Sequence, residues 1–155
     1  MKLSKPKEVL VFDFDGVLAI PYTHPEECYS DVVELMTMLK EEYILCVASY
    51  NPRAEVAIES WGIRDLFSVV LCGANYVWKG KEYDDKDRVE MRKDRQIVSI
   101  IKKELDELQI RYDQVAFFDD DQENIDLVTK ELPSVTCTFI DNKKGIQLED
   151  IVNCI

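Results

Sequence analysis

The chain has 155 residues, of which 46% are hydrophobic and 32% are charged, and its formal net charge is -12 at pH 7. This length fits one domain with a buried core, and the composition is that of a soluble globular protein rather than a disordered or membrane-bound one. A surface this acidic repels phosphate backbones and anionic lipid. A nucleic-acid partner is therefore disfavoured unless a local basic patch overrides the charge.

Five short apolar runs alternate with five helical patterns, which is typical of a parallel sheet with helices on both faces. None of the runs alternates with polar residues, so each is predicted to be a fully buried strand. In chain order the predicted strands are 9–13, 43–48, 68–72, 115–119 and 135–140. We therefore expect a single α/β domain over residues 1–155, a Rossmann-like three-layer sandwich with a five-stranded parallel sheet.

The first two helices are predicted between the first three strands. Apolar residues at helical spacing place the first helix at 32–39, after a cap at Ser30. The second helix is predicted to begin with a cap at Asn51 and Pro52 in its first turn, and to end at Gly62. Both patterns favour helices that bury one face on the sheet.

The second half of the chain continues the alternation after an irregular, charged segment at 73–92, which we expect to be an exposed loop. Asp94 is the predicted cap of a third helix whose apolar face runs as far as Leu108. Apolar residues over 125–132 outline a fourth helix, and a short last helix is predicted to begin near Gln147.

The five cysteines form no CxxC pair, and three of them, Cys46, Cys72 and Cys137, lie in apolar runs where cysteine acts as a small hydrophobic residue. The first apolar run is broken by Asp13 and is too short for a signal peptide. No apolar segment reaches the length of a transmembrane helix. We therefore expect a reducing, cytoplasmic location and no membrane partner.

Polar residues stand where several of these elements meet the sheet's carboxyl edge, which is where open α/β sheets bind ligands. Two aspartates follow the first strand, a serine ends the second, and three aspartates end the fourth, while a lysine precedes the third helix. We expect these side chains to surround one crevice. They are Asp13, Asp15, Ser49, Lys93, Asp119, Asp120 and Asp121, with Asn124 one turn later.

Several carboxylates in one crevice need protons or a cation, because two of them a few Å apart repel by roughly 4 kcal/mol at an effective dielectric constant of about 20. Mg²⁺ suits such a set, since it uses a few carboxylates and leaves room for a substrate phosphate. The alternative for Asp121 with Asn124 is to open a helix. The alternatives to the lysine at 93 are the nearby basic residues Lys79, Lys81, Arg92 and Arg95. His24, the only histidine, is assigned to the surface.

Four motifs in this order resemble those of the haloacid dehalogenase (HAD) superfamily. The stretch "VFDFDGVL" matches the first motif, Ser49 in "CVASYN" the second, Lys93 in "RKDRQI" the third, and "FFDDDQEN" the fourth. The segments "VAFFDDDQENIDLV" and "VTCTFIDNKKGIQLEDI" are similar in particular to the magnesium-dependent phosphatase-1 group. The resemblance covers nearly the whole chain and implies a phosphatase or phosphomutase, because halide-removing members lack the second aspartate of the first motif.

The resemblance also implies roles for these residues. Asp13 would attack phosphorus to form an aspartyl-phosphate, and Asp15 would act as the general acid and base. Mg²⁺ would be held by Asp13, by the backbone carbonyl of Asp15, by Asp120 and, directly or through water, by Asp119. The predicted phosphate-binding residues are Ser49, Lys93, Gly16, Tyr50 and Asn51.

The resemblance leaves the substrate open. Neither place where this superfamily inserts a cap domain has room for one, so we expect a capless phosphatase, whose acidic surface favours a phosphoprotein substrate over polynucleotide ends. A sugar phosphate is a further alternative, as is a catalytically silent scaffold of the same fold that binds metal. A receiver domain is excluded, because its lysine follows the acidic residues instead of preceding a second acidic cluster. No P-loop or dinucleotide glycine motif is present.

Overall fold

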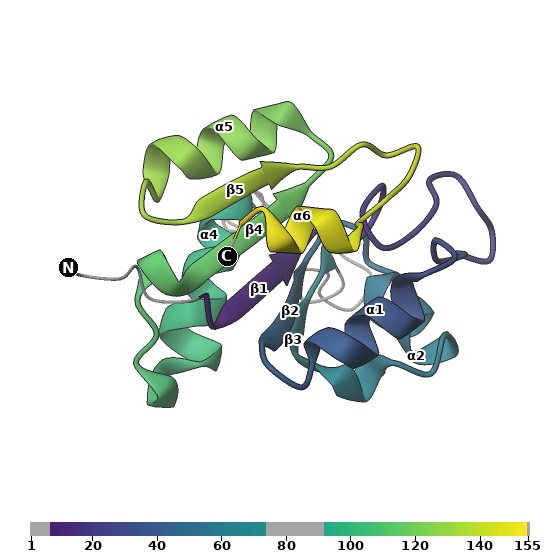
Figure 1. The fold of residues 1–155 in the computed structure, drawn as a ribbon, viewed down its shortest axis with the longest axis horizontal. Helices are drawn as coiled ribbons and strands as arrows, with labels where there is room; N and C mark the ends of the chain where they lie inside the picture. Colours follow the sequence, from purple (N-terminus) through teal and green to yellow (C-terminus); the bar gives the residue numbers. More distant parts are fainter. Residues whose placement is uncertain (1–6, 74–91, 155) are drawn as a thin grey trace, which may run out of the picture.

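The computed structural model describes residues 7–73 and 92–154, so most of the expected 73–92 loop, including Lys79 and Lys81, lies outside the described residues. Five parallel strands form one sheet in the order β3-β2-β1-β4-β5 (Figure 1). The predicted Rossmann-like α/β architecture is therefore confirmed. The strands are β1 (Val9–Phe12), β2 (Ile44–Ala48), β3 (Phe67–Leu71), β4 (Val115–Asp119) and β5 (Thr136–Phe139).

The central strand, β1, is buried on both faces, as its unbroken apolar sequence predicts. Leu10 and Phe12 pack into one core cluster, and Val9 and Val11 pack into the other. In register, Phe12 pairs with Phe118 of β4, and the two rings stack with centroids 5.1 Å apart. The polar residues that follow β1 and end β4 therefore lie level at one edge of the sheet.

Helices cover both faces of this sheet, which completes the three predicted layers. The cores place α1, α2 and α6 against one face and α4 and α5 against the other. No cap domain is present in the described part of the chain. The helices are α1 (Val32–Leu39), α2 (Ala54–Ser60), α4 (Lys93–Ser99), α5 (Gln122–Glu131) and α6 (Leu148–Val152), with short turns η1 (Arg64–Leu66), η3 (Ile100–Glu104), η4 (Asp106–Leu108) and η5 (Tyr112–Gln114).

The helices before β3 begin and end close to the predicted positions. The predicted Ser30 cap of α1 is wrong, since Asp31 stands at the cap position and caps through no side-chain hydrogen bond. The predicted cap of α2 at Asn51 is two residues early, since Arg53 stands at the cap position and Pro52 precedes the helix; Asn51 instead accepts a hydrogen bond from the backbone N–H of Arg53 at 2.9 Å. Gly62 ends α2 with φ +77°, a left-handed conformation that glycine adopts without strain.

The third predicted helix differs most from the structure. Asp94 is not its cap but lies buried in its first turn, in an ion pair of 3.1 Å with Arg92. The helix begins one residue earlier, at Lys93, and changes to a π-helical turn over η3. Leu108 lies in a separate turn and is 53% exposed. The apolar periodicity therefore continued past the end of the regular helix.

The last two helices agree with the sequence. Asp121 caps α5 by accepting a hydrogen bond from Glu123 N–H, and α6 follows Gln147. No helix among residues 7–73 and 92–154 is long and apolar enough to cross a membrane.

Candidate active site

A pocket of about 1050 Å³ lies at the carboxyl edge of the sheet. Most of the predicted site residues line it: Asp13, Asp15, Ser49, Tyr50, Asn51, Lys93 and Asp120. The remaining wall comes from residues of the 20–26 loop, from Arg53, from the start of α5, from Phe139 at the end of β5 and from Asn142 after it. Residues from five separate segments of the chain, 13–26, 49–53, 93, 120–124 and 139–142, thus meet at the predicted edge.

Asp13 and Lys93 form a buried ion pair at this edge. Lys93 Nζ lies 2.7 Å from Asp13 Oδ1 and 3.7 Å from Asp119 Oδ2, and it also donates to the carbonyl of Ala48. The lysine is only 1% exposed, and its ammonium lies 4.7 Å from the centre of the Tyr50 ring. Burial lowers the pKa of Lys93, but the two carboxylates outweigh it and hold that pKa above its ordinary value.

Asp119 is the most deeply buried carboxylate of the site, with no exposed surface. Its Oδ1 accepts from the backbone N–H of Asp121 at 2.9 Å, and its Oδ2 accepts from Asn124 Nδ2 at 3.1 Å. Burial, followed by the charge of Asp13, raises the pKa of Asp119 to about 8. Asn124, one helical turn into α5, thus supports the carboxylate at the end of β4.

Asp120 faces the pocket beside Asp119, and its pKa is raised by burial and then by the charge of Asp13. Asn142 Nδ2 donates to Asp120 Oδ2 at 3.3 Å, and the hydroxyl of Tyr29 donates to the carbonyl of Asn142. Gly16 has φ +80°, and a Cβ there would lie 2.1 Å from Asp120 Oδ2. Gly16 is therefore required both for its backbone conformation and for the space that Asp120 occupies.

The residues at this edge fit a hard divalent cation. Asp13, Asp119 and Asp120 each offer one carboxylate oxygen, and these atoms all lie within 4.8 Å of one another. We call these three residues the carboxylate cluster. Oxygen ligands of this kind suit Mg²⁺. Burial, and after it the charge of Asp13, raises the pKa of both Asp119 and Asp120, and a bound cation would favour their charged forms.

The turn after β2 presents Ser49 to the pocket. Its hydroxyl accepts from the backbone N–H of Asn51 at 3.0 Å, and Gln96 Nε2 donates to its carbonyl at 2.9 Å. Gln96 and Lys93 lie three residues apart, on one face of α4, and bind the carbonyls of Ser49 and Ala48. The first turn of α4 thereby holds the end of β2 in place.

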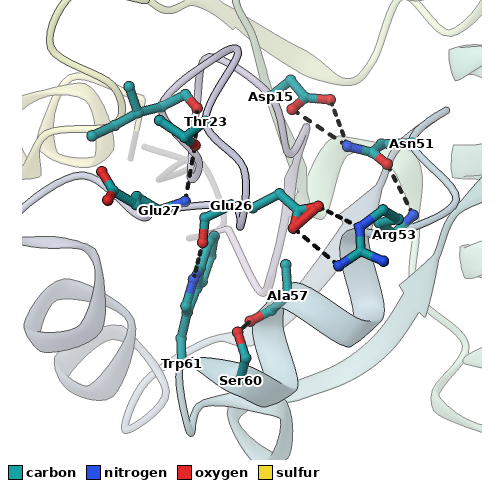
Figure 2. Close-up of polar contacts among 10 residues, drawn as sticks. Asp15, Thr23, Glu26, Glu27, Asn51, Arg53, Ala57, Ser60 and Trp61 are labelled. Atoms are coloured by element: carbon teal, nitrogen blue, oxygen red, sulfur yellow. Dashed lines mark hydrogen bonds and ion pairs between the residues drawn. The ribbon is translucent and has the colours of Figure 1, made fainter.

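Asp15 lies at the opposite side of that turn and is half-buried, which raises its pKa against the lowering effect of a hydrogen bond from Asn51. Asn51 Nδ2 lies 3.1 Å from Asp15 Oδ2 and 3.5 Å from Oδ1 (Figure 2). Both residues line the pocket. A carboxyl with a raised pKa at this position is suited to give up a proton to a leaving group.

A loop over residues 20–28 forms one rim of the pocket and is tied to α2. Glu26 pairs with Arg53 at 2.6 Å, and its carbonyl accepts from the indole N–H of Trp61 at 3.0 Å (Figure 2). Within the loop, Thr23 Oγ1 donates to the carbonyl of Ile20 and accepts from the N–H of Glu27. The rim is therefore held both by contacts with Arg53 and Trp61 and by hydrogen bonds within the loop.

Sequence reasoning did not find Asn142, Gln96 or the pair of Glu26 with Arg53. Asn142 follows the fifth predicted strand, so the rule that strand ends face the site contained the signal for it. The other three lie on helices or loops, where polar residues are common. Only the folded backbone brings Glu26 and Arg53 to the pocket and Gln96 to the carbonyl of Ser49.

The fold and this pocket have the features expected of a phosphatase. A family comparison agrees: residues 22–155 match the family described as acid phosphatase, and the chain belongs to that family. The matched residues include Ser49, Lys93 and the acidic residues after β4, and they begin after Asp13 and Asp15. No curated protein matches the chain.

Solved structures of low sequence identity share the fold. One is the N-terminal part of a Bacteroides fragilis protein, containing a phosphatase domain complexed with Mg. It aligns at a TM-score of 0.66 with 19% identity, and the alignment covers 97% of this chain and 40% of the Bacteroides chain. A phosphatase described as putative from Clostridium difficile aligns at 0.66 and 14% over 97% of this chain and 92% of its own. A HAD-superfamily hydrolase from Geobacter sulfurreducens aligns at a TM-score of 0.61 with 11% identity, and the alignment covers 86% of this chain and 89% of that one.

Proposed function

We propose that the protein is a Mg²⁺-dependent phosphomonoesterase that works through an aspartyl-phosphate on Asp13. One observation carries this proposal: Asp13 lines the pocket, forms an ion pair with the buried ammonium of Lys93, and offers a carboxylate oxygen within 4.8 Å of those of Asp119 and Asp120. An aspartate that contacts a cation and belongs to a metal-binding set is placed to approach a phosphate dianion, which it would otherwise repel.

In the first step an Asp13 carboxylate oxygen forms a bond to phosphorus while the bond from phosphorus to the ester oxygen breaks. Asp15, whose pKa burial raises, gives its proton to the departing oxygen. In the second step water attacks the aspartyl-phosphate, and Asp15 takes back a proton. The phosphorus bond to Asp13 breaks, and inorganic phosphate leaves with the carboxylate restored. Ser49 and Lys93 would bind the remaining phosphate oxygens in both steps.

The metal would be held by Asp13 and Asp120, with Asp119 as a direct or water-mediated ligand. When bound, Mg²⁺ supplies positive charge that offsets the negative charge of the phosphoryl group. Of the two residues after Phe118, Asp120 lines the pocket, next to Asn142, whereas Asp119 does not and already accepts hydrogen bonds at both oxygens. These contacts support Asp120 as the direct ligand.

For the substrate we propose a phosphorylated protein segment in the cytoplasm. The net charge of -12 disfavours polynucleotide ends, and the pocket of about 1050 Å³ exceeds what a phosphate alone requires. Among the described residues no disulfide is formed, which supports a reducing compartment. A sugar phosphate or a 3′-phosphorylated oligonucleotide remains the alternative substrate, and a silent metal-binding scaffold the alternative function.

The test is hydrolysis of p-nitrophenyl phosphate with Mg²⁺, after exhaustive EDTA treatment, and after Mg²⁺ is restored. We expect EDTA to abolish turnover reversibly. Asp13→Asn should abolish it while preserving the fold, because an amide is a poor nucleophile; Asp106→Asn, an exposed change of the same kind, is the matched control. Undiminished turnover in EDTA would exclude metal dependence, and Asp13→Asn activity within tenfold of the parent would exclude Asp13 as the nucleophile.

The substrate class is tested separately by comparing phosphotyrosyl and phosphoseryl peptides, sugar phosphates and 3′-phosphorylated oligonucleotides. A preference for the peptides in kcat/KM would support the phosphoprotein proposal. A preference for either other group would replace it without changing the proposed chemistry.

A further inference from the structure

We propose that Asn51 is a positioning residue that fixes the carboxyl group of Asp15 so that one chosen oxygen, Oδ1, delivers the proton to the leaving group. This inference rests on the proposed function and assigns to the Asn51 side chain a task other than binding phosphate.

The amide of Asn51 is held in one orientation by its neighbours. Its Oδ1 accepts from the backbone N–H of Arg53 at 2.9 Å, so the other end of the amide must be the Nδ2 donor. The backbone N–H of Asn51 donates to Ser49 Oγ at 3.0 Å, which fixes the residue at its base. Arg53 is itself held by its ion pair with Glu26 (Figure 2). The direction of the Nδ2 donor is therefore set by the backbone around it.

That donor points at Asp15 and treats its two oxygens unequally. Nδ2 lies 3.1 Å from Oδ2, within ordinary hydrogen-bond range, and 3.5 Å from Oδ1, at the limit of it. An oxygen that accepts from an amide N–H is the favoured carbonyl oxygen of a protonated carboxyl, because a proton on it would compete with the amide donor. The transferable proton is thereby directed to Oδ1.

Asp15 has few other contacts that fix it. Within residues 7–73 and 92–154, Asn51 is the one side chain that donates hydrogen bonds to its carboxylate. Without it, the carboxyl group is free to rotate, and the fraction of bound substrates that meet the proton in line decreases.

Asn51 also helps to open α2, and this structural role must be separated from the positioning role. The two roles use opposite ends of the amide. Asn51→Asp keeps an oxygen for the Arg53 N–H and removes only the donor to Asp15, adding a repelling carboxylate. Asn51→Ser is a neutral second variant: its hydroxyl is able to accept from a nearby backbone N–H but is too short to reach Asp15.

The experiment compares kcat/KM for phenyl phosphate and for p-nitrophenyl phosphate, two esters of similar shape. Phenolate is the more basic leaving group and needs the proton, whereas nitrophenolate departs without it. We expect both Asn51 variants to lower kcat/KM for phenyl phosphate by about tenfold to a hundredfold, which is part of the ~10²–10⁴ that a general acid supplies. For p-nitrophenyl phosphate we expect both variants to lower kcat/KM by less than about threefold. Thermal unfolding checks that each variant folds.

Asn153→Asp makes the same chemical change at an exposed residue after α6 and should leave the ratio of the two kcat/KM values at the parental figure. A parent that hydrolyses neither ester would overturn the proposed function, and this inference with it. If the parent is active and a folded Asn51→Asp or Asn51→Ser variant keeps the parental ratio of the two kcat/KM values, the role of Asn51 alone is overturned. An equal loss of activity toward both substrates has the same consequence.

Discussion

Replacing Lys93 by methionine removes the cation between Asp13 and Asp119 while keeping most of the apolar stem that α4 buries. At an effective dielectric constant of about 20, unit charges at the observed separations of 2.7 and 3.7 Å attract by roughly 6 and 4.5 kcal/mol. The cost of burying the ammonium, which is 1% exposed, opposes this attraction.

The net loss on deleting one partner of such a buried pair is typically ~3–5 kcal/mol, because the remaining charge is left without a partner. We expect a loss of this size in the free energy of unfolding of Lys93→Met at pH 9 in EDTA, because Asp119, with a pKa of about 8, is ionised in the parent at that pH. Adding Asp119→Asn should recover part of it, because one of the two repelling carboxylates is then neutral. Added Mg²⁺ should also recover part of it, since it replaces the missing positive charge.

The assay is urea unfolding followed by circular dichroism, with Lys103→Met as the matched control. Lys103 is exposed on η3, so its replacement should change the free energy of unfolding by no more than about 0.5 kcal/mol. If Lys93→Met unfolds within that same margin of the parent, or if Asp119→Asn destabilises the double variant further, the charge pairing argued here is refuted.

Three further results are expected. Burial raises the pKa of Asp119 from its ordinary 3.8 to about 8, so between these pH values the folded state holds a proton that the unfolded state releases. In EDTA the parent should therefore lose stability relative to Asp119→Asn as pH rises from about 4 to 8. Stability curves that run parallel with pH would contradict this. Gly16→Ala should raise the Mg²⁺ concentration for half-maximal turnover several-fold, since its Cβ displaces Asp120. Gly62→Ala is the control: Gly62 has φ +77° and open space around it, so this variant should only have a lower melting temperature. Equal Mg²⁺ requirements in the two variants would show that the clash at Gly16 is relieved elsewhere. Mg²⁺ should raise the melting temperature of the parent but not that of a variant with Asp13, Asp119 and Asp120 all changed to Asn, and an equal rise in both would place the binding outside the carboxylate cluster.

The strands and the carboxylates were predictable because they obey local rules. An apolar run without alternation forms a buried parallel strand, and a polar residue at its end must face the ligand edge. These two rules were enough to bring Asp13 and Asp119 together, although they lie at the ends of different strands. Four of the five strands differ from their predicted limits by one residue at one or both ends, and β4 agrees at both.

The contacts that orient those carboxylates were not predictable in the same way. The donor from Asn51 to Asp15 and the pair of Glu26 with Arg53 depend on how a loop and a helix terminus meet, which no periodicity records. The change from α-helix to π-turn after Ser99 left the apolar spacing intact, so Leu108 still read as part of the same helical face. Asp94 had the residue type of a cap, but the helix started one residue earlier, at Lys93.

The central strand has different neighbours on its two sides, and this divides the site. On one side β1 pairs with β2, which ends at the turn carrying Ser49; on the other it pairs with β4, which ends in Asp119 and leads to Asp120. Under the proposed function, the strand borders would divide the work: the β2 border carries Ser49 for phosphate, the β4 border carries Asp119 and leads to Asp120 for the metal, and Asp13 serves both. Substitutions along the β2 border would then change the affinity for a phosphate ester with little effect on the ion, and those along the β4 border would do the reverse.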